Sequence, residues 1–371
     1  MKNIEQIRQE INDIDNKLIE LFEKRMDLAE DVVNYKIEKG LPILDEKREQ
    51  QVLDKVRQLI SNSDYKDFAV DLFKHIMDYS KDYQKKLLQC QSDNQKIDAD
   101  LVLFQGMSGS YSEEAALAFF NETTKLTNVA RFEDVAIGVK DGTAMFGVLP
   151  LENSSTGSIL DVYDILRQYD CFIVGEVVLN ISHNLLGSTN ATIEDIKQVY
   201  SHPQGFEQCT SFLKLYPHWE CVPYHNTANS AQLVSKSNDP SKAAIASERA
   251  GKIHGLKTLA KSINNNYNNT TRFIVISSKQ MVDKEANKIS VLLQIKHKQG
   301  ELYRVLSHLA ANGLNMLKIE SRPIQGKKWE YSFYIDVEGS LADEKTLNTI
   351  KTLEKDCSYF KLLGNYKAAQ I

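Results

Sequence analysis

The first 39 residues contain neither glycine nor proline, and no other feature constrains the fold of this chain as strongly. Apolar residues recur in steps of three and four from Ile4 to Tyr35, which predicts one amphipathic helix. The run Gly40-Leu41-Pro42 marks its end. At ~1.5 Å per residue this helix would be about 55 Å long. Because a compact small domain does not accommodate that length, we expect a homodimer or a higher homo-oligomer.

Two more helices are expected, from Asp45 to Ile60 and from Asp64 to about Cys90, each with an apolar stripe. Residues 1–90 therefore predict an all-α domain. The polar run at 91–100 is typical of a linker.

Beyond the linker, short β-rich runs alternate with helical stretches, which predicts an α/β domain at 101–278. A second polar joint, Lys279 to Lys288, precedes the last segment. The strand-helix-strand-strand-helix-strand pattern at 288–368 indicates a ferredoxin-like α+β domain. A multidomain chain of three parts agrees with its length of 371 residues.

Composition limits the partners and the location of the chain. The net charge is −5, so the basic excess typical of nucleic-acid binding is missing. No stretch approaches ~20 apolar residues, so we expect no membrane span. The amino-terminal residues are too acidic for a signal peptide. The cysteines are scattered without a Cys-x-x-Cys pair, which favours a reduced, cytoplasmic protein.

Arg25 interrupts the apolar seam of the predicted first helix. A buried arginine without a counter-charge is costly, so either a protein carboxylate or a ligand anion must neutralise it. Ser80 and Gln84 interrupt the apolar stripe of the third helix in the same way. An internal salt-bridge network and a ligand pocket both explain these residues.

The spacing of two arginines distinguishes the kinds of pocket that are possible. Arg8 and Arg25 are 17 positions apart, which is about 25 Å on one helix. A small dianion cannot contact both. If both serve one pocket, Arg8 must come from an antiparallel partner chain.

This helical segment resembles the all-helical chorismate mutase family, whose members are intertwined dimers of three-helix chains. The matching positions are Arg8, Arg25, Lys36, Asp45, Arg48, Glu49, Ser80 and Gln84. The resemblance implies that Arg25 and a partner's Arg8 bind the carboxylates of chorismate. It also implies that Lys36 and Gln84 donate to the ether oxygen and that Glu49 holds the ring hydroxyl, while the remaining matched residues shape the pocket. A Claisen rearrangement needs orientation and charge stabilisation, so no cofactor is expected.

The α/β segment contains four polar stretches beside strands: Gly106–Ser112, Pro150–Ser158, Ser201–Gln204 and Thr270–Phe273. Loops at the carboxyl ends of strands bind ligands in α/β sheets, and a glycine-rich turn can hold an anion. Ordinary capping and turn residues would explain each stretch separately.

Together these stretches resemble prephenate dehydratase, a fold of two α/β lobes around a cleft, like that of periplasmic binding proteins. The resemblance makes Thr271 the catalytic candidate, as a hydrogen-bond donor. It places Asn153, Ser154, Ser201 and Gln208 in the cleft and makes Arg272 a carboxylate anchor. Gly205 and His225 depart from the family pattern. His202 is either a general acid or a structural residue.

The last segment resembles the ACT regulatory domain, which binds phenylalanine. Its ESRP signature is intact as Glu320, Ser321, Arg322 and Pro323, whereas only Gly300 and Leu302 remain of the second signature. A bare dimerisation module is the alternative.

In this order, the three segments are similar to the family of bifunctional chorismate mutase–prephenate dehydratases. That similarity implies conversion of chorismate to prephenate and then to phenylpyruvate, with L-phenylalanine as feedback inhibitor. An amino-acid receptor without catalysis is the competing interpretation. The histidines form neither a His-x-His nor a His-Glu-x-x-His pair, so no metal site is expected.

Overall fold

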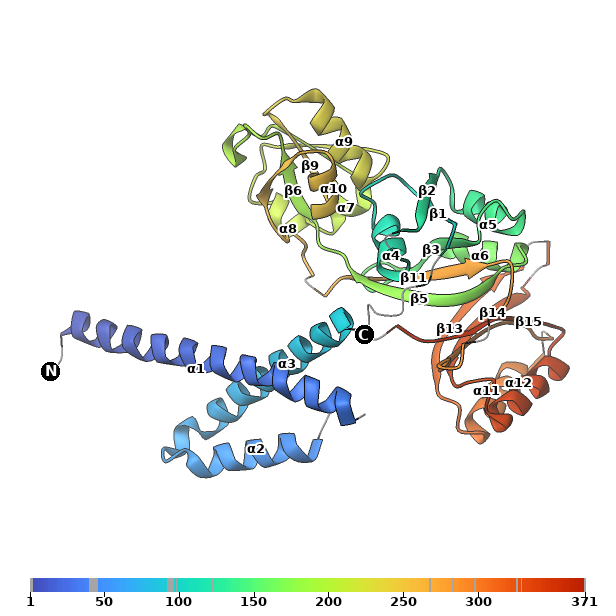
Figure 1. Ribbon diagram of the computed structural model, residues 1–371, viewed down its shortest axis with the longest axis horizontal. Coiled ribbons are helices and arrows are strands. Elements are labelled where there is room, and N and C mark those ends of the chain that lie inside the picture. The colour runs from blue at the N-terminus through green and yellow to red at the C-terminus, as the bar shows by residue number, and fades with distance from the viewer. Residues whose placement is uncertain are drawn as a thin grey trace. The chain divides into compact units, whose positions relative to one another are not determined.

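The computed structural model describes residues 3–39, 46–91, 97, 99–121, 123–266, 268–281, 283–296, 298–324, 326–327 and 329–369. The chain divides into two compact units, one up to Gln95 and one from Lys96 to Gln370. The expected linker at 91–100 lies largely outside the described residues. Figure 1 shows the elements of each unit.

The amino-terminal unit is helical, as the apolar periodicity predicts. It consists of α1 (Ile4–Lys39), α2 (Glu46–Leu59), a short 3₁₀ helix η1 (Ser63–Tyr65) and α3 (Lys66–Gln91). α3 packs against both other helices and buries Val70 and Met77. The Asn62 side chain caps η1 by accepting a hydrogen bond from the Asp64 N–H.

The apolar seam of α1 is exposed within this unit. Ile4, Ile11 and Leu18 each expose at least half of their surface, and Leu21 and Leu28 expose more than 60%. An apolar stripe of this length is normally covered in a folded protein.

The first sheet of the second unit, which we call the platform, lies at the centre of that unit's first lobe. Its strands are β1 (Leu101–Gln105), β2 (Lys125–Val129), β3 (Phe146–Asn153), β4 (Gly157–Ser158), β5 (Phe172–Asn180) and β11 (Thr270–Ser277). Their order is β2-β1-β3-β11-β5, with β4 paired to β3. β11 runs antiparallel to β3 and β5, whereas β1 and β3 are parallel. α4 (Tyr111–Phe119) covers one face, and α5 (Phe132–Lys140) and α6 (Leu160–Gln168) cover the other.

A second lobe is inserted between β5 and β11. Its five-stranded sheet has the order β10-β6-β9-β7-β8. The strands are β6 (Asn184–Gly187), β7 (Gln198–Ser201), β8 (Glu220–Pro223), β9 (Lys242–Ala246) and β10 (Lys257–Ala260), and the helical segments are η3 (Ile193–Asp195), α7 (Pro203–Glu207), α8 (Thr210–Leu213), α9 (Thr227–Ser237) and α10 (Glu248–Ile253). The chain enters this lobe after β5 and leaves it before β11, so two connections join the lobes.

The last segment has the predicted βαββαβ order. It contains β12 (Lys288–Gln294), α11 (Glu301–Ala311), β13 (Met316–Pro323), β14 (Tyr331–Glu338), α12 (Glu344–Asp356) and β15 (Tyr359–Tyr366). The four strands form an antiparallel sheet in the order β13-β14-β12-β15. Both helices lie on one face of this sheet, and the other face turns towards β5 and β11 (Figure 1).

This second face packs directly on the platform. Leu292 and Leu363 join the apolar core that contains Leu149 and Ile173. Gly364 permits the contact, since a Cβ atom there would overlap the backbone oxygen of Ile173. The carboxy-terminal sheet and the first lobe are therefore one packed body.

The cysteines and the hydropathy of the helices bear on what the composition led us to expect. Cys171, Cys209, Cys221 and Cys357 are free thiols. No helix in the described part of the chain has both the length and the hydropathy that a bilayer crossing requires.

Candidate functional site

A cavity of about 540 Å³ lies between the two α/β lobes. The first lobe contributes Tyr111, Asn153, Thr271 and Phe273, and the second contributes His183, His202, Gln208 and His225. None of the described residues that line it is Lys, Arg, Asp or Glu. An anion in this cavity would therefore meet neutral hydrogen-bond donors, histidines and the ends of helices.

The amino termini of two helices face this cavity. Ser110 caps α4 and Asn226 caps α9, and both line the cavity. Their neighbours Ser112 and Thr227 line it as well. Helix amino termini carry partial positive charge and free N–H groups, so this arrangement favours an anionic ligand without a lysine or arginine.

Asn153 fixes the position of Thr271. Its Nδ2 donates to Thr271 Oγ1 at 2.9 Å and to Asn269 Oδ1 at 2.8 Å. Its Oδ1 accepts from the backbone N–H groups of Ser155 and Thr156. Asn153 thus uses both its N–H bonds within the protein, and the Thr271 hydroxyl hydrogen remains to donate into the cavity.

His183 is a cavity residue that sequence reasoning missed. Its Nε2 lies 2.9 Å from Gln208 Oε1, and its Nδ1 lies 3.3 Å from the Tyr111 hydroxyl. Burial lowers the pKa of His183 and so favours the neutral ring in the folded protein. The signal was the short polar run Ser182-His183-Asn184, close to the end of a strand.

Several predicted residues lie near the cavity without lining it. Ser201 is fully buried, and its hydroxyl donates to the Ile245 carbonyl at 3.1 Å. Ser154 is exposed and donates to the Asn268 carbonyl. The N–H of Gly109, in the glycine-rich turn, donates to the Glu113 carboxylate of the helix that follows. This N–H is therefore not available to bind an anionic ligand.

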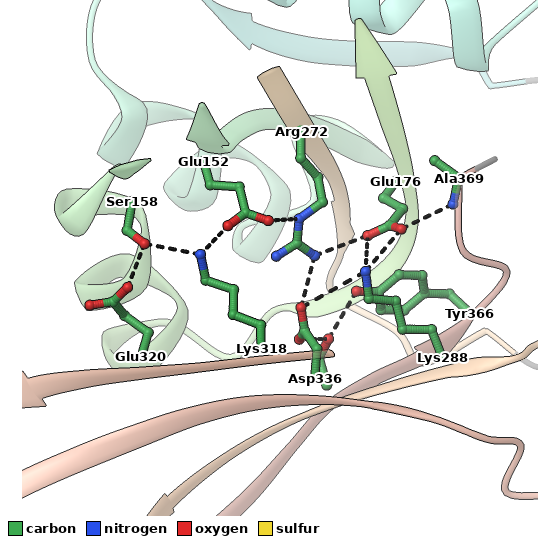
Figure 2. A network of polar contacts seen from close by, with 11 residues as sticks. Glu152, Ser158, Glu176, Arg272, Lys288, Lys318, Glu320, Asp336, Tyr366 and Ala369 are labelled. Atoms are coloured by element: carbon green, nitrogen blue, oxygen red, sulfur yellow. Dashed lines mark hydrogen bonds and ion pairs between the residues drawn. The ribbon is translucent and has the colours of Figure 1, made fainter. Parts of the chain in front are cut away.

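Arg272 does not face the cavity, contrary to its expected role as a carboxylate anchor. It is 7% exposed and points towards the carboxy-terminal sheet, where it forms ion pairs with Glu152, Glu176 and Asp336 (Figure 2). Alternation along β11 explains this, because Thr271 and Arg272 are consecutive and must point to opposite faces. Three carboxylates of the protein already pair with its Nε and Nη1 atoms.

The ESRP signature also alternates along its strand, β13. The Ser158 hydroxyl donates to Glu320, and Arg322 forms an ion pair with Asp164 of α6. Ser321 and Pro323 point the opposite way and are exposed. Gly300 caps α11 with φ of +85°, and Leu302 lies half-buried in its first turn.

The amino-terminal unit keeps Arg25 free of carboxylates among the described residues. Its Nη1 donates to the Ile76 carbonyl at 3.4 Å, and burial lowers its pKa. Glu49 forms an ion pair with Lys81 at 3.1 Å, Ser80 is buried, and Arg8 and Arg48 are exposed. Asp45 and the side chains of Lys36 and Gln84 lie outside the described residues.

Comparison with known proteins identifies the family. The chorismate mutase type II family model matches residues 7–85, and the prephenate dehydratase family model matches residues 102–281. The bifunctional chorismate mutase/prephenate dehydratase of Buchnera aphidicola subsp. Acyrthosiphon pisum (strain APS) is 35% identical over 370 residues, which cover 98% of this chain and 96% of that protein. The chain belongs to this bifunctional family.

Solved structures match the second unit. The prephenate dehydratase from Arthrobacter aurescens, in complex with L-Phe, superposes with a TM-score of 0.66 at 26% identity and covers 72% of this chain and 90% of that one. GqqA, described as a novel type of quorum quenching acylase, gives the same TM-score at 27% identity and covers 72% of this chain and 98% of that one.

Family membership decides between the two interpretations of the sequence. The chain is therefore an enzyme of phenylalanine biosynthesis with chorismate mutase and prephenate dehydratase activities. A receptor without catalysis is excluded.

Proposed function

We propose that the cavity between the lobes binds prephenate and that Thr271 is the catalytic hydrogen-bond donor of the dehydratase. The observation that carries this proposal is the 2.9 Å bond from Asn153, which orients the Thr271 hydroxyl at the cavity wall. Prephenate is a dianion, and the amino termini of α4 and α9 supply the partial positive charge that its carboxylates need.

In the reaction, the ring carboxylate leaves as CO2 while the ring hydroxyl leaves with a proton as water. The electron pair of the breaking C–C bond completes the aromatic ring and displaces the C–O bond. Thr271 donates a hydrogen bond to the departing oxygen and stabilises the charge that develops there. The amide of Gln208, whose oxygen faces His183, offers its N–H groups to the substrate.

Replacing Thr271 by valine tests this role. We expect Thr271→Val to lower the dehydratase kcat by about 10²- to 10³-fold, since it removes one preorganised donor from the reacting centre. Thr271→Ser is the matched control, because it keeps the hydroxyl. The mutase rate of the same preparation reports whether the chain is intact. A Thr271→Val enzyme with an undiminished dehydratase kcat would contradict the proposal.

For the mutase we propose a homodimeric site. Arg25, Lys36, Asp45, Arg48, Glu49, Ser80 and Gln84 of one chain would act with Arg8 of its partner. The exposed seam of α1 supports this arrangement, because a second copy would cover it. Burial lowers the pKa of the Arg25 guanidinium, which supports the proposal that a bound anion neutralises it. The Glu49 carboxylate pairs with Lys81 at 3.1 Å and can also accept a hydrogen bond from a hydroxyl.

We further propose that the carboxy-terminal segment is an ACT domain that binds L-phenylalanine and transmits inhibition. The L-Phe complex of the Arthrobacter aurescens relative supports it. Gly300 and Leu302 would contact the effector together with the exposed side of the ESRP strand, which carries Ser321 and Pro323. Glu320 and Arg322 would link the effector site to the dehydratase lobe through Ser158 and Asp164. The cytoplasm is the compartment we expect for these reactions.

A further inference from the structure

A layer of buried charges lies between the platform and the carboxy-terminal sheet (Figure 2). Arg272, Glu152 and Glu176 come from three neighbouring strands of the platform, β11, β3 and β5. They meet Lys288, Lys318 and Asp336 from β12, β13 and β14. Three cations and three carboxylates balance, as buried ions must if they are to remain charged.

Arg272 is the centre of this layer. Its Nε lies 2.5 Å from Glu152, and its Nη1 lies 3.0 Å from Glu176 and 2.9 Å from Asp336. A planar guanidinium presents its N–H donors at fixed angles and can bind several carboxylates in one fixed geometry. Burial raises the pKa of Glu152, but Arg272 and Lys318 more than offset this, so the pKa is lowered and the carboxylate stays ionised.

The pairing of β3 with β11 connects the Arg272–Glu152 ion pair to the cavity. Thr271 is paired with Asn153 and Arg272 with Glu152, but the next pair is Phe273 with Pro150. β3 therefore contains a bulge at Leu151. Phe146, Val148 and Pro150 face the α4 side, and regular alternation would have placed Glu152 there as well. The bulge inverts the alternation, so that Asn153 instead faces the cavity.

A bulge also disrupts the backbone ladder, so the register beyond it depends on other contacts. Beyond the bulge, two side-chain hydrogen bonds join β3 to β11, one on each face of the sheet. The Asn153–Thr271 bond lies on the cavity face, and the Glu152–Arg272 pair lies on the face towards the carboxy-terminal sheet.

We infer that Arg272 is a positioning residue of the dehydratase: by binding Glu152 across the bulge, it holds β3 and β11 in the register that sets Asn153 against Thr271. This inference rests on the proposed role of Thr271. The carboxy-terminal sheet contributes to this positioning, since Asp336 and Lys318 supply two of the three further ion pairs that hold the Arg272–Glu152 pair. The dehydratase site thus depends on that sheet even without an effector.

The test compares kcat and KM for phenylpyruvate formation in the full-length enzyme. Arg272→Lys keeps the charge but loses the planar fork. We expect its dehydratase kcat to fall by about 10²-fold with KM within about threefold, as a small misplacement of a catalytic donor produces. Glu152→Gln, at a less buried position, should give the same pattern and serves if the first variant folds poorly. The mutase rate of each preparation should be unchanged.

Lys288→Met is the matched control. Lys288 lies in the same buried layer and pairs with Glu176 at 2.9 Å and with Asp336 at 3.9 Å, two partners of Arg272, but it forms no ion pair with Arg272 or Glu152 themselves. If the layer has only a structural role, Lys288→Met and Arg272→Lys will lower the melting temperature and kcat together. The inference instead requires that Lys288→Met keeps kcat within about threefold while it lowers the melting temperature.

A double variant separates this inference from the proposed function. In a Thr271→Val background, Arg272→Lys should lower kcat by less than about threefold more, because residues that act as a unit are not additive. Full additivity, or an unchanged kcat in a folded Arg272→Lys enzyme, would overturn the inference and leave Thr271 in its role. Full activity of Thr271→Val alone would overturn both.

Discussion

The side-chain amide of Asn153 donates to the hydroxyl of Thr271 across two strands, between residues 118 positions apart in the sequence. The other N–H of the Asn153 amide donates to Asn269, and its oxygen accepts hydrogen bonds from the turn that follows β3. It has no polar hydrogen left for a ligand. We therefore propose that Asn153 acts by orienting Thr271 and does not itself donate a hydrogen bond to the substrate.

Asn153→Ala should consequently act on kcat. The Thr271 hydroxyl would lose the donor that orients it, and we expect kcat to fall by about 10- to 100-fold with little change in KM. The backbone N–H groups of Ser155 and Thr156 would lose their acceptor, which costs about 1–3 kcal/mol of stability. Steady-state kinetics and denaturant unfolding measure the two effects.

Asn265→Ala is the control for this prediction. Asn265 makes a comparable set of bonds, to the Glu207 carbonyl, the Thr210 hydroxyl and the Ser211 N–H, outside the cavity lining. It should lower stability and leave kcat within about twofold. A larger change in KM than in kcat for Asn153→Ala would indicate that Asn153 binds prephenate directly.

Mixing two inactive chains tests the shared mutase site. Arg25→Ala should abolish mutase activity and spare the dehydratase, and Arg8→Ala should do the same. In a mixed dimer, one site receives both substitutions and the other receives neither. An equimolar, fully exchanged mixture should therefore regain about a quarter of the wild-type mutase rate.

The same mixture distinguishes the alternatives for Arg8. If each pocket took both arginines from one chain, no combination would restore activity, and the mixture would stay inactive. Arg57→Ala is a suitable control in each chain, because Arg57 is exposed and pairs only locally with Asp54 at 3.0 Å among the described residues.

The sequence predicted the helices of the first unit and the strands that carry the dehydratase residues, because both follow from hydrophobic periodicity. It also singled out Thr271, Asn153 and Gln208, whose side chains now line one cavity. It misplaced Arg272. Because side chains alternate along a strand, Thr271 and Arg272 must face opposite sides of the sheet. Only the tertiary packing determines which of these sides faces the cavity.

The bulge at Leu151 explains why more could not be predicted. The polar stretch that begins at Pro150 was expected to be a loop beside a strand, whereas β3 continues to Asn153. A bulge has no firm sequence signature, yet it exchanges the faces of Glu152 and Asn153. His183 was missed for a related reason, since its partner Gln208 lies 25 residues away.

The stability of the dehydratase unit should depend on His183 at mildly acidic pH. Burial holds the pKa of His183 below the ordinary value of 6.5. As the pH falls through about 6.5, the unfolded chain takes up a proton there and the folded chain does not, so stability decreases. Above that pH both states are neutral at this residue, and its contribution no longer changes.

His183→Gln should remove this part of the pH dependence. The measurement is the melting temperature from about pH 7 to pH 5, where the wild-type curve should fall more steeply than that of the variant. The difference between the curves isolates His183 from other titrating groups. Parallel curves would show that His183 keeps an ordinary pKa in the folded protein.

Asp164→Asn should weaken inhibition by phenylalanine more than it weakens phenylalanine binding. Asp164 lies on α6 and pairs with Arg322, on the strand that carries the ESRP signature. If the effector binds the carboxy-terminal domain, its influence on the cavity must pass through contacts between that domain and the lobe. A partly exposed ion pair is worth about 0.2–1 kcal/mol, so the coupling should fall by a factor of about 1.4 to 5.

Titration calorimetry gives the affinity for phenylalanine, and the dehydratase rate at saturating phenylalanine gives the residual activity. Asp161→Asn is the matched control, since Asp161 is an exposed residue one turn earlier on the same helix whose charge acts on Arg322 only from a distance, without an ion pair. If Asp164→Asn instead abolished phenylalanine binding, the signature would act as part of the effector pocket. An unchanged residual activity would mean that the inhibition travels through other contacts, of which the buried layer around Arg272 is the nearest.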